Sequence, residues 1–149
     1  LMLDQTHITE SMQKQWFDRM SESDSQYYFL AWFKDQPIGV ASLIKIDEIN
    51  GVLQGTIIKT FPAPGETPLI YCNLCKDDRK DKPLIGMKIM SDLKKDGLGS
   101  WSDGKILDPK NGETYKVKLL TEDGKKMDVR GYIGVPLLGR TQVWYKAEQ

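Results

Sequence analysis

Closely spaced turn signals in the C-terminal third of this chain constrain its fold more than any other feature. In chain order the signals are Asp108-Pro109, Asn111-Gly112 and Asp123-Gly124. They separate short segments in which apolar and polar residues alternate, and turns of this kind join neighbouring antiparallel strands. The segment from Trp101 to Trp144 therefore predicts an antiparallel meander, with strands expected at 100–107, 114–121, 126–134 and 140–146.

Three further strands are expected in the first half of the chain, at 27–34, 38–47 and 52–60. The first is apolar on both alternating faces, which indicates a strand that is covered on both sides. Asn50-Gly51 lies between the second and the third, and it is a strong hairpin signal because both residues tolerate positive φ. An irregular segment rich in proline and charge follows at 61–85.

Two segments have helical periodicity. Residues 9–22 place four apolar side chains on one helical face, namely Met12, Trp16, Phe17 and Met20. In residues 86–93, Met87, Met90 and Leu93 recur every three residues, which favours a short helix over a strand. We therefore expect an N-terminal α-helix packed against the strands and a second short helix before the meander.

Length and charge bound the class of protein. A chain of 149 residues suits a single domain, 1–149, with one hydrophobic core. Its 21 basic residues balance 21 acidic ones, so neither nucleic acid nor a membrane is an expected partner. No apolar run approaches the roughly 20 residues that span a bilayer, and the N-terminal residues lack the pattern of a secretory signal. Leu1 ahead of Met2 indicates a processed or engineered start, so the localisation stays unassigned.

From about Gly51 to Lys146 the chain resembles the bacterial family known as domain of unknown function 2147. The matching residues are GVLQGTI at 51–57, KDKPLIGMKI at 80–89, Trp101, Gly104, Ile106, Asp108, Pro109, Gly112, Tyr115, VRGY at 129–132 and GRTQVW at 139–144. The resemblance implies a lipocalin-like antiparallel barrel from an exported family with no established activity. The family usually opens with a strand that carries a Gly-x-Trp element, and this chain departs from that pattern.

Residues 9–50 resemble instead the opening of a GNAT-type N-acetyltransferase. The resemblance rests on Gln15, Trp16 and Phe17 in the expected helix, on the strand YYFLAWFKD, and on QPIGVASLIKID leading to Asn50. Enzymes of that class bind acetyl-CoA on a Gln/Arg-x-x-Gly-x-Gly/Ala loop that opens a helix, where backbone amides meet the pyrophosphate. The chain has no such sequence, so no cofactor is expected.

Together the two resemblances suggest a chimera, natural or engineered. A barrel without its first strands has unpaired edges that invite aggregation or swapping, and the hairpin at 27–47 would supply them. We expect a mainly β (α+β) fold, a lipocalin-like β-barrel or barrel-like meander of about seven strands with an N-terminal α-helix. Residues 1–50 would be the GNAT-like part and residues 51–149 the barrel part of a monomer or a strand-swapped dimer.

Five residues near the C-terminus are the candidate ligand-binding residues, namely Arg130, Tyr132, Arg140, Gln142 and Trp144. Alternation puts the last three on one face of a strand, and the first two on one face of the neighbouring strand. Guanidinium and aromatic groups together bind anionic or planar ligands. The structural alternative is an arginine stacked over the tryptophan, closing one end of the barrel.

Cys72 and Cys75 have the spacing most suggestive of chemistry, in the sequence CNLC. Four interpretations stay open: a plain loop or structural disulfide, a free thiol pair, a metal site and a redox pair. A closed zinc site needs about four ligands, and the only other candidate of those residue types is His7, far away in the chain. A metal site is therefore not expected, and a plain loop or structural disulfide is the favoured interpretation.

The sequence indicates no catalytic residues. Asp103 and Asp108 are candidates for a carboxylate pair, but an Asp near a turn commonly satisfies local backbone amides. With His7 as the single histidine, Ser-His or Cys-His catalysis has no support. We therefore expect a non-enzymatic barrel that binds a small molecule in its interior or at its rim. The alternatives are an acetyltransferase-related protein and, for an artificial chimera, no selected activity.

Overall fold

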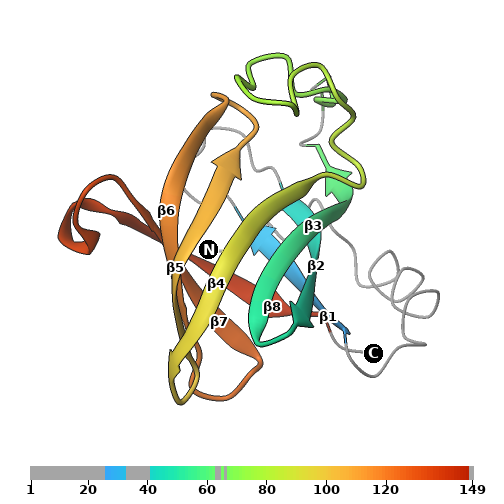
Figure 1. The fold of residues 1–149 in the computed structure, drawn as a ribbon. Coiled ribbons are helices and arrows are strands. Elements are labelled where there is room, and N and C mark those ends of the chain that lie inside the picture. The colour runs from blue at the N-terminus through green and yellow to red at the C-terminus, as the bar shows by residue number, and fades with distance from the viewer. Residues whose placement is uncertain (1–25, 33–40, 63–64, 66, 148–149) are drawn as a thin grey trace.

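Hairpin turns and alternating strands build an up-and-down barrel. A computed structural model describes residues 26–32, 41–62, 65 and 67–147, and in it eight antiparallel strands close into one barrel in chain order (Figure 1). The strands are β1 (Gln26–Trp32), β2 (Ala41–Ile49), β3 (Val52–Phe61), β4 (Lys88–Gly97), β5 (Ser100–Asp108), β6 (Glu113–Leu120), β7 (Lys126–Tyr132) and β8 (Arg140–Lys146). A short 3-10 helix, η2 (Pro136–Leu138), lies between the last two strands.

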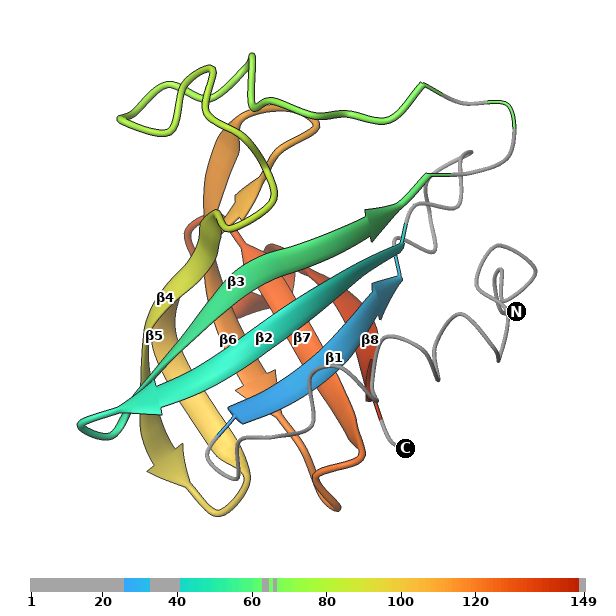
Figure 2. The same cartoon turned by 90° about the vertical axis from the view of Figure 1, so that its right-hand side faces the viewer.

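The expected strands are confirmed, with bounds that differ by a few residues. The β2–β3 hairpin turns at Asn50 and Gly51, whose φ angles of 55° and 78° are those that a tight primed turn requires. β1 pairs with β2 on one side and with β8 on the other, so the barrel has no open edge (Figure 2). The expected α-helix at 9–22 lies outside the described residues. Within the described ranges, no helix is long and apolar enough to cross a bilayer.

The short helix expected at 86–93 is wrong, because this segment forms β4 and raises the strand number to eight. Its pairing register with β3 shifts twice, between Leu53 and Gly55 and again before Thr56. Asp92 has a φ of 63°, which locally breaks the two-residue alternation. Met87, Met90 and Leu93 are consequently all buried at a spacing of three, which imitates a helical stripe.

The half of the barrel near the β2–β3, β4–β5 and β6–β7 turns is a packed apolar core. Buried side chains from several strands fill it, including Leu53, Leu93, Val117, Leu119 and Met127. Gly104 on β5 makes this packing possible, since a Cβ there would lie 2.4 Å from Leu93 Cγ and 2.9 Å from Val117 Cγ1. This half of the barrel is therefore filled by its own side chains.

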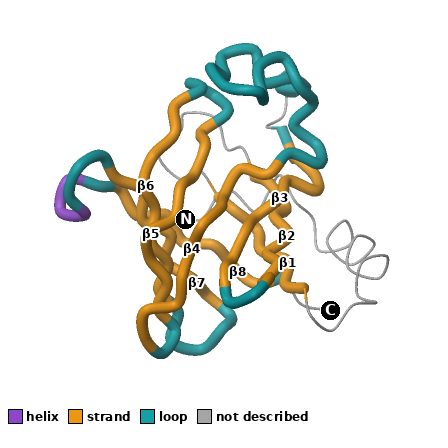
Figure 3. Tube along the Cα trace, viewed as in Figure 1, coloured by secondary structure: helices purple, strands orange, loops and turns teal. Residues whose placement is uncertain are grey.

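A long connection between β3 and β4 lies across the other end of the barrel, and we call residues 67–87 the lid loop (Figure 3). Cys72 and Cys75 are joined by a disulfide within it and are 0% and 2% exposed. The loop docks on the β5–β6 turn, where a Cβ on Gly112 would lie 1.8 Å from the Leu74 carbonyl oxygen. Lys76 forms an ion pair with Glu113 at the same contact. The lid loop thus ties the β3–β4 side of the barrel to the β5–β6 side.

Candidate ligand-binding cavity

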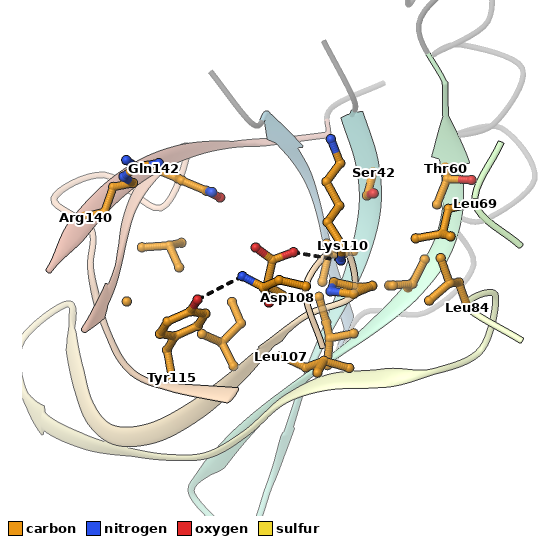
Figure 4. Close-up of a pocket in the computed structure, with 18 of the residues that line it drawn as sticks. Ser42, Thr60, Leu69, Leu84, Leu107, Asp108, Lys110, Tyr115, Arg140 and Gln142 are labelled. Carbon is orange, nitrogen blue, oxygen red and sulfur yellow. Dashed lines mark hydrogen bonds between the residues drawn. The ribbon is translucent and has the colours of Figure 1, made fainter. Parts of the chain in front are cut away.

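The half of the barrel beneath the lid loop holds a cavity of about 1430 Å³. Its walls come from β2 to β8, and its rim comes from the lid loop, the β5–β6 turn and the β7–β8 connection. Figure 4 shows side chains from these elements converging on one space. The same barrel is therefore solid at one end and hollow at the other.

Buried apolar side chains form most of the inner lining. They are Ile44, Ile57, Leu84, Ile89, Leu107, Val129 and Trp144. Trp144 on β8 is 1% exposed, and its Nε1 donates a hydrogen bond to Gln142 Oε1 at 3.2 Å. The indole ring is thus fixed by a polar neighbour on its own strand, as a buried tryptophan usually is.

Polar side chains lie on the wall and rim of this cavity. Arg140 and Gln142 project together from β8, and Tyr115 stands on β6, where its hydroxyl accepts a hydrogen bond from Asn111 Nδ2 at 3.0 Å (Figure 4). Among the described lining residues, the charged groups are Arg140, Lys110 and Asp108. Two cations against one carboxylate give the described lining a positive balance at neutral pH.

Four of the five residues expected to bind a ligand line the cavity, and Arg130 does not. Arg140, Gln142 and Trp144 share one face of β8, and Tyr132 lines the cavity at the end of β7. Arg130 lies between Val129 and Gly131, which line the cavity, so alternation turns its side chain outward. Its guanidinium donates to Pro136 O at 2.7 Å, Thr141 Oγ1 at 2.7 Å and Leu137 O at 3.3 Å.

Several residues that line the cavity are not among the candidates expected from the sequence. Tyr115 on β6 and Leu84 in the lid loop are examples. Tyr115, Val117 and Leu119 are spaced by two residues and so lie on one face of β6, which could have placed Tyr115 on the inner face. Leu84 carries no such signal, because its place depends on how the lid loop folds over the barrel.

The remaining candidate residues lie elsewhere or act locally. Asp108 Oδ1 accepts the Lys110 backbone amide at 2.9 Å, as a turn-stabilising aspartate does, although the residue also borders the cavity. Asp103 lies in β5 rather than at a turn, exposed and with a φ of 63°. His7 lies outside the described residues. Among the residues that the structure describes, no group of three or more His, Cys, Asp or Glu side chains could hold a metal ion.

Comparison with solved structures finds protein HP1028 from the human pathogen Helicobacter pylori, described as belonging to the lipocalin family. The two share 20% sequence identity with a TM-score of 0.65, over 83% of this chain and 82% of the other. At this identity the likeness shows the fold alone, a lipocalin-like barrel. A search of curated proteins finds no match.

A family model described as "Uncharacterized protein conserved in bacteria (DUF2147)" matches residues 31–146. The match reaches back through β2 into β1, and therefore includes most of the hairpin compared above with an acetyltransferase. Neither comparison supports a GNAT segment or a chimera. Since the match covers most of the chain, this protein belongs to the DUF2147 family of uncharacterized bacterial proteins.

Proposed function

We propose that this protein binds a small amphipathic molecule in the cavity beneath the lid loop. The observation that carries the proposal is the cavity itself, about 1430 Å³ of space with an apolar inner lining and a few polar groups at its wall and rim. Ligand sites in proteins have this composition, because apolar surface supplies affinity and sparse polar groups supply orientation.

The apolar part of the ligand would lie against the buried residues of the inner lining, Ile57, Leu107 and Val129 among them. Each square ångström of apolar surface removed from water contributes about 25 cal/mol, so a short acyl chain suffices for measurable affinity. The disulfide-closed lid loop supports this arrangement, since Leu84 reaches the cavity from it.

The polar part of the ligand would lie near Arg140 and Gln142, which come from the same face of β8. A carboxylate or other anion suits these groups, because the described lining has more cations than carboxylates and a guanidinium binds carboxylates with two parallel donors. This ligand class needs no catalytic group, and the proposal is of a binding protein rather than an enzyme.

The test is titration with decanoate and 1-decanol, which share a chain and differ in the head group. Isothermal calorimetry should give saturable 1:1 binding of decanoate. Arg140→Gln should weaken decanoate by about tenfold or more and leave 1-decanol nearly unchanged, because it removes a charge-assisted contact. Equal loss for both compounds would mean that Arg140 does not contact the head group.

Gly131→Leu tests the location of the site. A Cβ at Gly131 would meet its nearest neighbours at 3.8 Å, so a side chain fits there and extends toward the cavity that Gly131 lines. We expect this variant to weaken both compounds by at least about tenfold, the equivalent of 1.4 kcal/mol. Asp128→Leu is the matched control, since it adds the same side chain to an exposed position of β7. Unchanged binding in Gly131→Leu would place the site elsewhere.

A further inference from the structure

The connection between β7 and β8 exposes an unusual amount of aliphatic surface. We call residues 133–139 the aliphatic loop, and it projects away from the barrel wall (Figure 1, red-orange). Its large apolar residues are Ile133, Val135, Leu137 and Leu138, exposed by 69%, 53%, 84% and 75%. Charged residues do not occur between positions 131 and 139. A group of exposed aliphatic side chains this close together in the chain is typical of an interaction site.

The aliphatic loop is held in this conformation by defined bonds. The Arg130 guanidinium binds the carbonyl oxygens of Pro136 and Leu137 and is itself joined to Thr141. Leu138 N and Gly139 N donate to Val135 O and Pro136 O, closing the turn. At its base, a Cβ on Gly139 would lie 2.5 Å from Gly131 O, so that position needs glycine. The loop is therefore built to present its side chains to the outside.

Basic residues lie on the strands at the base of the aliphatic loop. Residues 129–144 contain two arginines, Arg130 and Arg140, and no carboxylate. On the neighbouring strand β6, Lys116 pairs with Tyr132 and Lys118 pairs with Arg130. Although the chain as a whole has no net charge, the aliphatic loop is therefore next to a local group of basic residues.

We propose that the aliphatic loop inserts into an anionic lipid surface. A tip of branched aliphatic side chains reaches the acyl boundary, while the basic groups at its base lie at the level of the phosphates. A protein partner fits less well, since the residues that dominate the binding energy of protein interfaces are enriched in Trp, Tyr and Arg, with Leu and Val under-represented. A projecting tip also enters a fluid lipid layer without needing a complementary groove.

Lipid docking would set the cavity against the lipid surface. Ile133, Leu138 and Gly139 belong to the aliphatic loop and also border the cavity. An apolar molecule could then pass between lipid and cavity with little exposure to water. The docking itself goes beyond the proposed ligand binding and stands whether or not decanoate binds.

The test is flotation of the full chain with vesicles of phosphatidylcholine, with and without 30% phosphatidylglycerol. The wild type should float with the anionic vesicles, less with pure phosphatidylcholine, and less again at high salt. Val135→Ser/Leu137→Ser should lower the partition coefficient onto anionic vesicles by at least about tenfold, because two aliphatic side chains that would be buried in the lipid are lost. Leu98→Ser is the matched control, because Leu98 is 97% exposed at the β4–β5 turn at the opposite end of the barrel.

A second variant gives a positive signal. The emission of Leu137→Trp should shift to the blue on adding anionic vesicles, and that of Leu98→Trp should not. Equal flotation of the Val135→Ser/Leu137→Ser variant, or no blue shift at position 137 with vesicles present, would overturn the proposal. Concentration-dependent dimers in vesicle-free sedimentation that the double variant abolishes would also overturn it, and would assign the aliphatic loop to contact between two copies of the chain.

Discussion

Glycine has opposite roles at two positions inside this barrel. A Cβ at Gly104 would overlap Leu93 and Val117 at 2.4 to 2.9 Å, whereas one at Gly131 would have its nearest neighbours at 3.8 Å. We expect Gly104→Ala to lower the free energy of unfolding by about 1–3 kcal/mol through overpacking. Gly131→Ala should be neutral or stabilising by up to about 1 kcal/mol, because alanine loses less backbone entropy on folding.

Urea unfolding of the two alanine variants measures this difference. The wild type and the Asp128→Leu variant serve as references for an unchanged core. Similar losses at both glycines would contradict a barrel that is packed in one half and hollow in the other.

At the level of single residues, the alternation of side chains along a strand was informative for β8. It put Arg140, Gln142 and Trp144 on one face, and all three line the cavity. Alternation did not show which face of β7 points into the barrel, because large amphipathic residues such as Arg130 and Tyr132 also suit the lining of a ligand site. The decisive feature is Gly131, whose missing side chain leaves room inside the barrel.

In the lid loop, Arg79 connects the charged segment to the barrel. Its side chain donates to both Asp77 carboxylate oxygens and to Lys88 O at 3.0 Å, at the start of β4. The Arg79 hydrogen bonds lower the pKa of Asp77 to about 2, from an ordinary value of 3.8. Because the pKa is lower in the folded state, this contact stabilises the fold above pH 3.8 and loses that contribution as the pH falls toward 2.

Carboxyl-detected NMR titration measures this pKa. We expect Asp77 to titrate near pH 2 in the wild type and at a higher pH in Arg79→Gln, still below its ordinary value, because the backbone amide of residue 79 donates to Asp77 Oδ1 in both. Asp123 is the internal control, since the backbone amides of Lys125 and Lys126 lower its pKa at the other end of the barrel. An Asp77 titration that Arg79→Gln leaves unmoved would show that the ion pair does not form in solution.

At the level of elements, strands flanked by regular turns could be predicted from sequence and β4 could not. Asn50-Gly51 fixed one hairpin because both residues need positive φ. β4 combines two register shifts with a positive φ at Asp92, and its buried Met90 and Leu93 lie three positions apart, with Met87 just before the strand. Local periodicity cannot separate such a bulged strand from a helical turn.

For the molecule as a whole, closure by β1 is the feature on which the barrel depends. β1 pairs with both β2 and β8, and Ala147 N donates to Tyr28 O at 2.7 Å beside this closure. A chain that lacks residues 1–40 would leave the facing edges of β2 and β8 unpaired. We expect it to associate or to lose cooperative unfolding, as measured by size-exclusion chromatography and circular dichroism.

The control for this truncation is a chain that begins at Gln26, which keeps all eight strands. If the chain without residues 1–40 stayed monomeric with an unchanged urea midpoint, closure by β1 would not hold the barrel together.

The family resemblance predicted the overall fold. Because the resemblance was recognised only from about Gly51, it did not show that the first strands belong to the same family. The expected resemblance began near Gly51, because the opening Gly-x-Trp element is missing, whereas the family match begins at residue 31. Whether the barrel interior is filled was not accessible from sequence, since eight strands can enclose either side chains or a ligand. Whether the interior is filled depends on the space around residues such as Gly104 and Gly131, which only the three-dimensional structure shows.

The most direct test of a ligand site in the hollow half is amide NMR of the full chain titrated with decanoate. We expect saturable shifts at cavity-lining residues such as Ile57, Val129, Gly131 and Gln142. The amides of Leu53, Leu93 and Leu119, in the packed half, should stay unchanged. No saturable shifts, or shifts confined to the aliphatic loop, would contradict a ligand site in the hollow half of the barrel.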